Sequence, residues 1–330
     1  MSSGIISKNE PLKQIKSYLD NFKNTLFLNS LFDLIKKKKL LEIVKLNKKL
    51  QKIMNLSIKD YQKYSESYSS IELELKLKNS SFRKDFTKIL GKEEKYYHIY
   101  FDDSKEEIKR NYLKENEKVD TIKIIIDYQV TSFKELFNSC EIISSINFKK
   151  FYRANITDMS YMFNDCSSLI EFKSSNFNTN NVTNMSFMFN GCIALKELNL
   201  SNFNNNNLTN MSFMFTQCES LKVINFSNFN TNNVTNMEGM FMGCVSLIEL
   251  DLSSFNTNNV ASMSGMFADC LSLKELNLSS FNISNATGTS DMFDGCSQEL
   301  KKKIKEKYST INFGEKSGLN SSPKSFCTFI

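Results

Sequence analysis

The sequence of 330 residues contains a single histidine, His98, and this scarcity excludes several kinds of active site. A nucleophile activated by histidine could use only His98, which lies in an alternating, strand-like stretch, KYYHIYF (95–101). The sequence also contains no G-x-x-x-x-G-K-[ST] loop, no H-E-x-x-H helix, no C-x-x-C pair and no G-x-G-x-x-G turn. We therefore expect no enzymatic activity and no cofactor.

Long apolar runs are missing as well. No stretch of 18 apolar residues is present, so we expect no membrane-spanning helix. The first residues lack a basic region followed by an apolar run, so we expect no signal peptide. Sequons such as NVT at 181 and 233 would attract glycans in a secreted protein. We favour instead a cytoplasmic protein whose sequence is rich in asparagine.

Charge is modest and unevenly distributed. The formal net charge is +6, and the segment from Lys36 to Lys52 holds eight lysines against one acid, Glu42. Residues 156–295, in contrast, are poor in charge and rich in Asn and Ser. A protein that binds nucleic acid in general usually spreads basic residues over its whole working face. We therefore expect no nucleic-acid partner.

Cysteine is the residue with the most regular distribution. Seven of the eight cysteines recur at intervals of 26 residues, and the eighth, Cys327, falls outside the series. The members of the series are Cys140, Cys166, Cys192, Cys218, Cys244, Cys270 and Cys296. A phenylalanine stands three residues before each of them, so the chain contains internal repeats.

Each repeat combines two periodicities, as in NVTNMSFMFNGCIALKELNLSNFNNN (181–206). Its first half has helical spacing, with Gly191 suited to a left-handed position at the end of a helix. The residues at this spacing are Val182, Met185, Phe189 and Cys192. Its second half, LKELNLS (195–201), alternates as a half-buried strand does. The pattern predicts one short helix and one short strand per repeat.

The strand half, LxxLxLxxF, matches the leucine-rich-repeat core LxxLxLxxN with Phe in place of Asn. The longer pattern NVTxMxxMFxxCxxLxxLxLSxF resembles the 26-residue form of the BspA-like leucine-rich repeats over residues 130–296. The resemblance implies an α/β fold: a leucine-rich-repeat solenoid with parallel strands on one side and short helices on the other. One repeat alone cannot offset the cost of ordering its backbone, about 1–2 kcal/mol per residue, so the repeats must stack.

Stacking suggests a role for the cysteines. Equivalent residues of a solenoid lie about 4.8 Å apart along its axis, so the cysteines would form a linear column inside it. Zinc needs about four ligands that converge on one point, and parallel side chains in a reducing compartment disfavour disulfides. We therefore expect buried packing thiols and no metal. The asparagines at 155, 181, 207, 233, 259 and 285 are expected to form an amide ladder.

Regions outside the repeats are less regular. Residues 1–62 predict a helical N-terminal region, within which residues 25–56 resemble a degenerate F-box. Residues 63–129 predict a mixed α/β region that caps the solenoid, with strands at 71–77, 95–101 and 121–127. A helix is expected at 104–115, begun by Ser104 and Glu107 as a capping box. Residues 297–308 predict a C-terminal capping helix, and 309–330 a flexible tail.

These features favour a non-enzymatic interaction protein that binds a protein ligand on the concave sheet. The predicted contact residues are the outward strand positions Glu171, Glu197, Glu249, Glu275, Asn199, Asn225, Asp251 and Asn277. Their acidic and polar character indicates a basic or polar partner. Two alternatives are an F-box-like substrate adaptor that docks a ubiquitin-ligase subunit through residues 25–56, and a surface or adhesion protein.

The remaining cysteine raises a separate possibility for the C-terminus. Cys327 stands fourth from the end in SSPKSFCTFI, where a prenylation box requires a cysteine. The final Ile resembles the bulky apolar residue that the geranylgeranyl enzyme reads, although Phe stands at the third position of the box. Prenylation of Cys327 would tether the protein to the cytoplasmic face of a membrane, with nearby lysines as a second signal.

Overall fold

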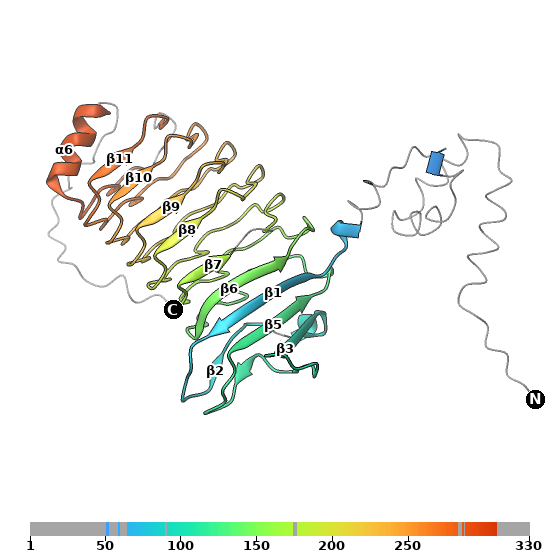
Figure 1. Cartoon of the computed structure of the whole chain (residues 1–330). Coiled ribbons are helices and arrows are strands. Elements are labelled where there is room, and N and C mark those ends of the chain that lie inside the picture. The colour runs from blue at the N-terminus through green and yellow to red at the C-terminus, as the bar shows by residue number, and fades with distance from the viewer. Residues whose placement is uncertain are drawn as a thin grey trace, which may run out of the picture. The chain divides into compact units, whose positions relative to one another are not determined.

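The computed structural model describes residues 51–52, 59, 65–89, 91–173, 177–282, 286 and 288–308. The chain divides into two compact units, Met1–Ser69 and Ser70–Ile330. The predicted helical region (1–62) and its F-box-like segment fall almost wholly outside the described residues, and so do the tail (309–330) and Cys327. Figure 1 labels most of the strands of the second unit and its helix α6.

The second unit begins with a five-stranded sheet in the order β3-β5-β1-β6-β7. The strands predicted at its start are present as β1 (Ile71–Leu77), β3 (Tyr97–Phe101) and β5 (Thr121–Ile126). β1 pairs antiparallel with both β5 and β6 (Ile143–Lys150), whereas β6 pairs parallel with β7 (Glu171–Lys173). The first strands of the unit therefore continue directly into the sheet of the repeats.

Alternating burial explains why these segments are strands. Ile71, Leu73 and Leu75 of β1 are at most 1% exposed, and the residues between them are half-buried. A short antiparallel pair, β2 (Lys84–Asp85) with β4 (Tyr112–Leu113), and a 3-10 helix (Gly91–Tyr96) complete this region. One side of the sheet thus enters the apolar core while the other carries polar side chains.

The helix predicted at 104–115 is wrong. Ile108 instead forms an antiparallel bridge with Ile99, and residues 112–113 are strand β4. The Ser104 hydroxyl accepts the Glu106 N–H, as in a turn, and the Glu107 carboxylate contacts His98 and Lys109 rather than the start of a helix. Pairing with distant strands has overridden a local helix signal here.

The repeats form a stack of short parallel strands. β8 (Glu197–Asn199) pairs with β9 (Val223–Asn225), and β10 (Glu249–Asp251) pairs with β11 (Glu275–Asn277), each with a 26-residue offset. A second row of parallel bridges links Ser132, Asp158, Asn184, Asn210, Asn236, Ser262 and Gly288 in turn. Both rows keep the same register, so each repeat lies directly on the next (Figure 1).

The helix predicted in each repeat is also wrong, and the described residues of the repeats are strands and turns. In the repeat at 181–206, alternate N–H groups donate to the next repeat, as from Phe189 to the Met214 carbonyl at 2.9 Å. The N–H groups between them donate three residues back, as from Cys192 to Phe189 at 3.1 Å. An α-helix would instead direct every N–H four residues back.

Left-handed residues produce this pattern. In each of these segments, the residues five and one before the cysteine have φ between 53° and 74°, as at Phe187 and Gly191. A left-handed residue interrupts a right-handed helix after one turn. Gly191 is left-handed as predicted, but it belongs to a ladder of turns and not to the end of a helix.

The interior columns are those that the repeat predicts. The phenylalanine rings three residues before the cysteines stack from repeat to repeat, with centroids 5.3 to 5.9 Å apart. Met185, Phe189 and Cys192 are 0% exposed, as are their equivalents in the next repeat. Helical spacing therefore identified the correct inward residues although the segment is not a helix.

The C-terminal helix α6 (Gln298–Lys307) is present where the sequence predicts it. The Ser297 hydroxyl accepts the Leu300 N–H at its start, and Leu300 and Ile304 are buried. The Tyr308 hydroxyl accepts the Leu278 N–H at 3.0 Å. In earlier repeats the same N–H binds a carbonyl of the next strand, as Leu252 does with Asn277 at 3.1 Å. Tyr308 thus replaces the absent next repeat.

Two glycines of the turn ladder provide a stability test. A Cβ on Gly191 would collide with the Asp165 carboxylate and lie 3.3 Å from the Asp165 Cα, whereas a Cβ on Gly243 meets only ordinary contacts, at 3.5 Å or more. Because both positions are left-handed, each substitution to alanine should lower the free energy of unfolding by about 1–2 kcal/mol through the backbone alone. Gly191→Ala should cost clearly more than Gly243→Ala in denaturant unfolding. Equal losses would show that the packing of Asp165 on Gly191 does not constrain the stack.

Candidate interaction surface

The sheet face of the repeats presents the predicted contact residues together. In β8, β10 and β11 the first residue points outward, while the middle residues Leu198, Leu250 and Leu276 are at most 6% exposed. Glu197, Glu249 and Glu275 are exposed in this way, and Glu171 of β7 is half-buried. β8 pairs with β9 and β10 with β11, and the uninterrupted row of bridges from Ser132 to Gly288 keeps all the repeats in equal register, so these glutamates form a row. We call this row the acidic row.

The four glutamates of the acidic row differ in the contacts that their side chains make. Glu171 accepts from the Ser145 hydroxyl at 2.9 Å and pairs with Lys173, and Glu275 pairs with Lys303 of α6 at 2.8 Å. The Lys303 contact lowers the pKa of Glu275. Glu197 and Glu249 make no side-chain hydrogen bond or ion pair with any described residue. Two carboxylates of the row are therefore available to a partner.

The second predicted column has a structural role. The Oδ1 atoms of Asn199, Asn225, Asp251 and Asn277 accept the backbone N–H two residues later, at 2.9 to 3.1 Å. This contact closes the turn that follows each strand. The N–H of Ser253 also lowers the pKa of Asp251. Substituting these residues would disturb the turns as well as the surface, so they are poor probes of binding.

The cysteine column is buried, as expected. All seven cysteines of the series are free thiols at most 4% exposed. From the second cysteine on, each Sγ also donates to the carbonyl of the phenylalanine 29 residues earlier, at 3.1 to 3.2 Å. That carbonyl already accepts the cysteine N–H of its own repeat. The thiol thus adds an inter-repeat bond that spacing alone did not reveal.

The expected asparagine ladder is present at five of its six positions. The Nδ2 of Asn181 donates to the Ala154 carbonyl at 2.7 Å, and Asn207, Asn233 and Asn259 make the same contact to the preceding repeat. Asn155 donates to Tyr128 and Val130, and Asn285 lies outside the described residues. These amides hold loop backbone, so the loop edge offers fewer free groups than the sheet face.

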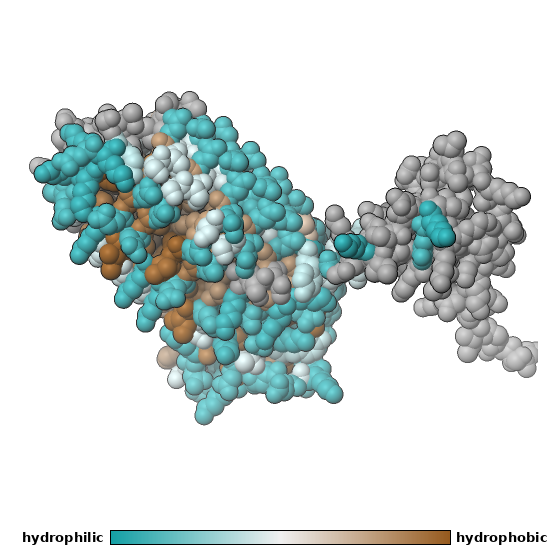
Figure 2. Space-filling view, turned by 45° about the horizontal axis from the view of Figure 1, so that its top comes forward, coloured by the Kyte–Doolittle hydropathy of each residue, from teal (hydrophilic) through white to brown (hydrophobic). Residues whose placement is uncertain are grey.

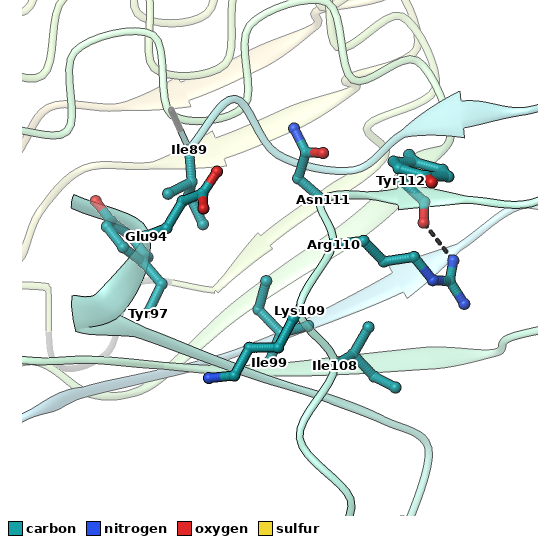
Figure 3. Close-up of a pocket in the computed structure, with 9 residues that line it drawn as sticks. All are labelled: Ile89, Glu94, Tyr97, Ile99, Ile108, Lys109, Arg110, Asn111 and Tyr112. Carbon is teal, nitrogen blue, oxygen red and sulfur yellow. Dashed lines mark hydrogen bonds between the residues drawn. The ribbon is translucent and has the colours of Figure 1, made fainter. Parts of the chain in front are cut away.

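A cavity of about 230 Å³ lies away from the repeats, between the 3-10 helix and residues 108–112 (Figure 3). Ile89, Ile99 and Ile108 contribute apolar surface, and Arg110 and Lys109 contribute charge. Both cations are already paired, Arg110 with Glu117 and Lys109 with Glu107. Its lining contains no nucleophile paired with a base, so it offers no catalytic arrangement.

His98 is held between two carboxylates. Its Nδ1 lies 2.8 Å from Glu107 and its Nε2 lies 3.5 Å from Asp127. These contacts tie β3 to the end of β5, in keeping with a structural role. Among the described residues no group of three or more His, Cys, Asp or Glu side chains could hold a metal ion. No helix in the described part of the chain is long and apolar enough to span a membrane.

The geometry defines the class: a protein of stacked repeats, built mostly of short strands and turns, with an exposed sheet face. The chain belongs to the family described as "Mycoplasma protein of unknown function, DUF285", which matches residues 131–225 and 218–326. This match supports the BspA-like repeat resemblance. It begins after residues 25–56 and gives the F-box interpretation no support.

Similarity to individual known proteins is weaker. No curated protein matches the chain. A leucine-rich repeat protein from Bacteroides ovatus, known from its crystal structure, is similar at 18% identity with a TM-score of 0.28. The similarity covers 51% of this chain and 49% of that protein, so the chain spans about half its length. A TM-score this low supports no conclusion about the fold. The evidence for stacked repeats is the parallel bridges between repeats and the family match.

The buried thiols lead to a labelling prediction. Burial raises the pKa of Cys192 well above its ordinary value and that of Cys218 to about 12, so both stay protonated at pH 8. The thiolate is the reactive form. N-ethylmaleimide should therefore leave both cysteines unmodified in the native protein and label them after unfolding, as read by peptide mass spectrometry. Rapid native labelling of Cys192 would contradict a packing role for the column.

Proposed function

We propose that the chain is a non-enzymatic interaction protein, a leucine-rich-repeat solenoid that binds a protein partner on its concave sheet face. Repeat folds of this kind are typical of interaction or surface proteins. The observation that carries the proposal is the acidic row, in which Glu197 and Glu249 are exposed without a partner among the described residues. Rigid strands hold both carboxylates in a fixed arrangement, which reduces the entropy lost on binding.

Differences between repeats also favour the sheet face. The inward columns repeat the same residue types, with Phe and Cys at every position. The first outward strand residue changes, from Glu197 to Val223 and back to Glu249. The fold does not fix the residue at this position, so the sheet face is free to carry the features that recognise a partner. The loop edge, in contrast, uses its asparagine side chains to hold the preceding repeat.

A role as a ligase adaptor, a lipid anchor and display on a surface have separate tests. A substrate adaptor of a ubiquitin ligase would need residues 25–56, so deletion of that segment should release a ligase subunit. Cytoplasmic location, prenylation at Cys327 and display on a surface are separated by cell fractionation and the intact mass of the native protein. A C-terminus that still ends in unmodified Ile330 would exclude the lipid anchor.

The sheet-face proposal predicts a selective loss of binding. Glu197→Lys with Glu249→Lys should abolish capture of the native partner by a photo-crosslinking residue at position 223. Stability should change by no more than about 0.5 kcal/mol, because surface substitutions without partners are usually that mild. The measurement is the yield of crosslinked product in the native cell, together with the melting temperature.

A crosslinking residue at Gln217 is the matched control. Gln217 is exposed in the turn ladder, outside the strands, and should give no product. Glu275→Lys is unsuitable as a probe because it would also break the ion pair with Lys303. Crosslinks from position 217 that survive the double reversal, with none from position 223, would place the partner elsewhere.

A further inference from the structure

The acidic row is interrupted at one strand. β9 begins with Val223 where β8, β10 and β11 begin with glutamate. Val223 is 56% exposed, and the next residue, Ile224, is only half-buried, whereas its equivalent Leu250 is 5% exposed. Two apolar side chains thus meet solvent at strand positions where β8, β10 and β11 expose a glutamate and bury a leucine. Ile170 and Ile248, directly before β7 and β10, are exposed as well. Figure 2 shows apolar surface of this kind among the hydrophilic side chains of the repeats.

A cavity of about 360 Å³ lies beside this interruption. Val223 and Ile224 contribute its apolar part, and Glu249, Asp251 and Glu275 contribute carboxylates. Lys222 and Lys307 also line it. The cavity is therefore a small open site in which an apolar surface adjoins a group of acids. Lys222, which precedes β9, and Lys307 of α6 contribute positive charge to its lining.

The three acids of this cavity are equal in number to the lysines near them, Lys222, Lys303 and Lys307, but Glu249 has no direct ion pair among the described residues. Glu249 and Glu275 are directly paired in the parallel register, and like charges opposite each other in a sheet are destabilising. Lys303 pairs with Glu275, but no described residue pairs with the Glu249 carboxylate. A cation bound between the two carboxylates would relieve the repulsion. Because Lys222 and Lys307 are nearby, one positive charge fits this site better than a run of them.

Spacing relates the apolar and acidic parts. β9 and β10 belong to separate two-stranded sheets, but the bridges from Asn210 to Asn236 and from Asn236 to Ser262 keep the three repeats in register. At the usual spacing of about 4.8 Å between neighbouring parallel strands, Val223 is about 7 Å from the midpoint between Glu249 and Glu275. Side chains i and i+2 of an extended peptide lie on the same side, about 6.6 Å apart. A peptide that crosses the strands could therefore place an apolar residue on Val223 and, two positions away, a basic residue between the carboxylates.

We propose that this cavity binds an extended peptide segment of the partner in which an apolar residue and a single arginine or lysine are separated by one residue. The inference rests on the proposed function and names the chemistry of its ligand. The apolar residue covers Val223 and Ile224, and the cation pairs with Glu249 and Glu275. The segment requires both features, so a purely basic or purely apolar peptide binds less well.

The direct test uses the full chain and fluorescein-labelled GSVSRSG-amide, followed by fluorescence anisotropy. Replacing arginine with citrulline, which keeps the shape and removes the charge, should weaken binding at least about tenfold. Replacing the valine with serine should weaken it several-fold. A labelled tetralysine should bind less tightly than GSVSRSG-amide. Equal affinity for the arginine and citrulline peptides would overturn the proposal.

Val223→Glu is the most informative variant. It installs the residue that the other strands hold at this position, so the fold should tolerate it. It also adds negative charge, so nonspecific attraction of a cation would strengthen. The proposal predicts the opposite, a loss of about tenfold or more, because the apolar contact is removed and a desolvated charge is added. Tighter or unchanged binding to Val223→Glu would contradict it.

A matched pair of neutralising variants completes the design. Glu249→Gln, inside the cavity, should weaken peptide binding, whereas Glu219→Gln, exposed outside both the cavity lining and the acidic row, should leave it within about twofold. If the peptides fail but crosslinking of the native partner from the sheet face persists, this inference is wrong and the proposed function stands. If crosslinking from the sheet face also fails, the proposed function itself is wrong.

Discussion

The rest of the structure depends on the backbone hydrogen bonds between consecutive repeats. In the turn segments between Met159 and Asp269, alternate N–H groups donate to carbonyls of the next repeat, as from Phe189 to Met214 and from Gly191 to Thr216. The bonds between them stay inside the repeat, three residues back. Every repeat is thereby locked at a 26-residue offset. This register aligns the buried columns and the outward strand residues at the same time.

The sequence alone predicts the stack, its period and its inward residues, but not the conformation of half of each repeat. Spacings of three, four and seven residues fit a helix, and Met185, Phe189 and Cys192 do share one buried side. Successive turns in which two residues, four positions apart, are left-handed bury the same positions. The distinguishing feature is the left-handed backbone at Phe187, where a bulky residue gives no sequence signal. Among the left-handed positions, only those occupied by glycine, such as Gly191, indicate this conformation in the sequence.

The candidate site was predictable to a similar extent. Alternation correctly places the glutamates and asparagines on one face. It cannot distinguish Glu249, whose carboxylate has no partner among the described residues, from Asn199, whose carbonyl oxygen accepts the Ser201 N–H. The first is a free surface group and the second closes a turn. Similarly, the ion pair between Glu275 and Lys303 depends on where α6 lies, which the repeat pattern does not determine. Contacts between distant segments are the missing information in each case.

The stacking of the repeats is therefore tested most directly by the hydrogen bond that the Phe189 N–H makes. Couplings measured by NMR across the hydrogen bond report the donor nitrogen and the acceptor carbonyl directly. The inter-repeat ladder predicts a coupling between the Phe189 nitrogen and the carbonyl carbon of Met214, whose oxygen lies 2.9 Å away. A coupling from Phe189 to the carbonyl carbon of Met185, four residues back, would instead establish a helix and contradict the inter-repeat ladder.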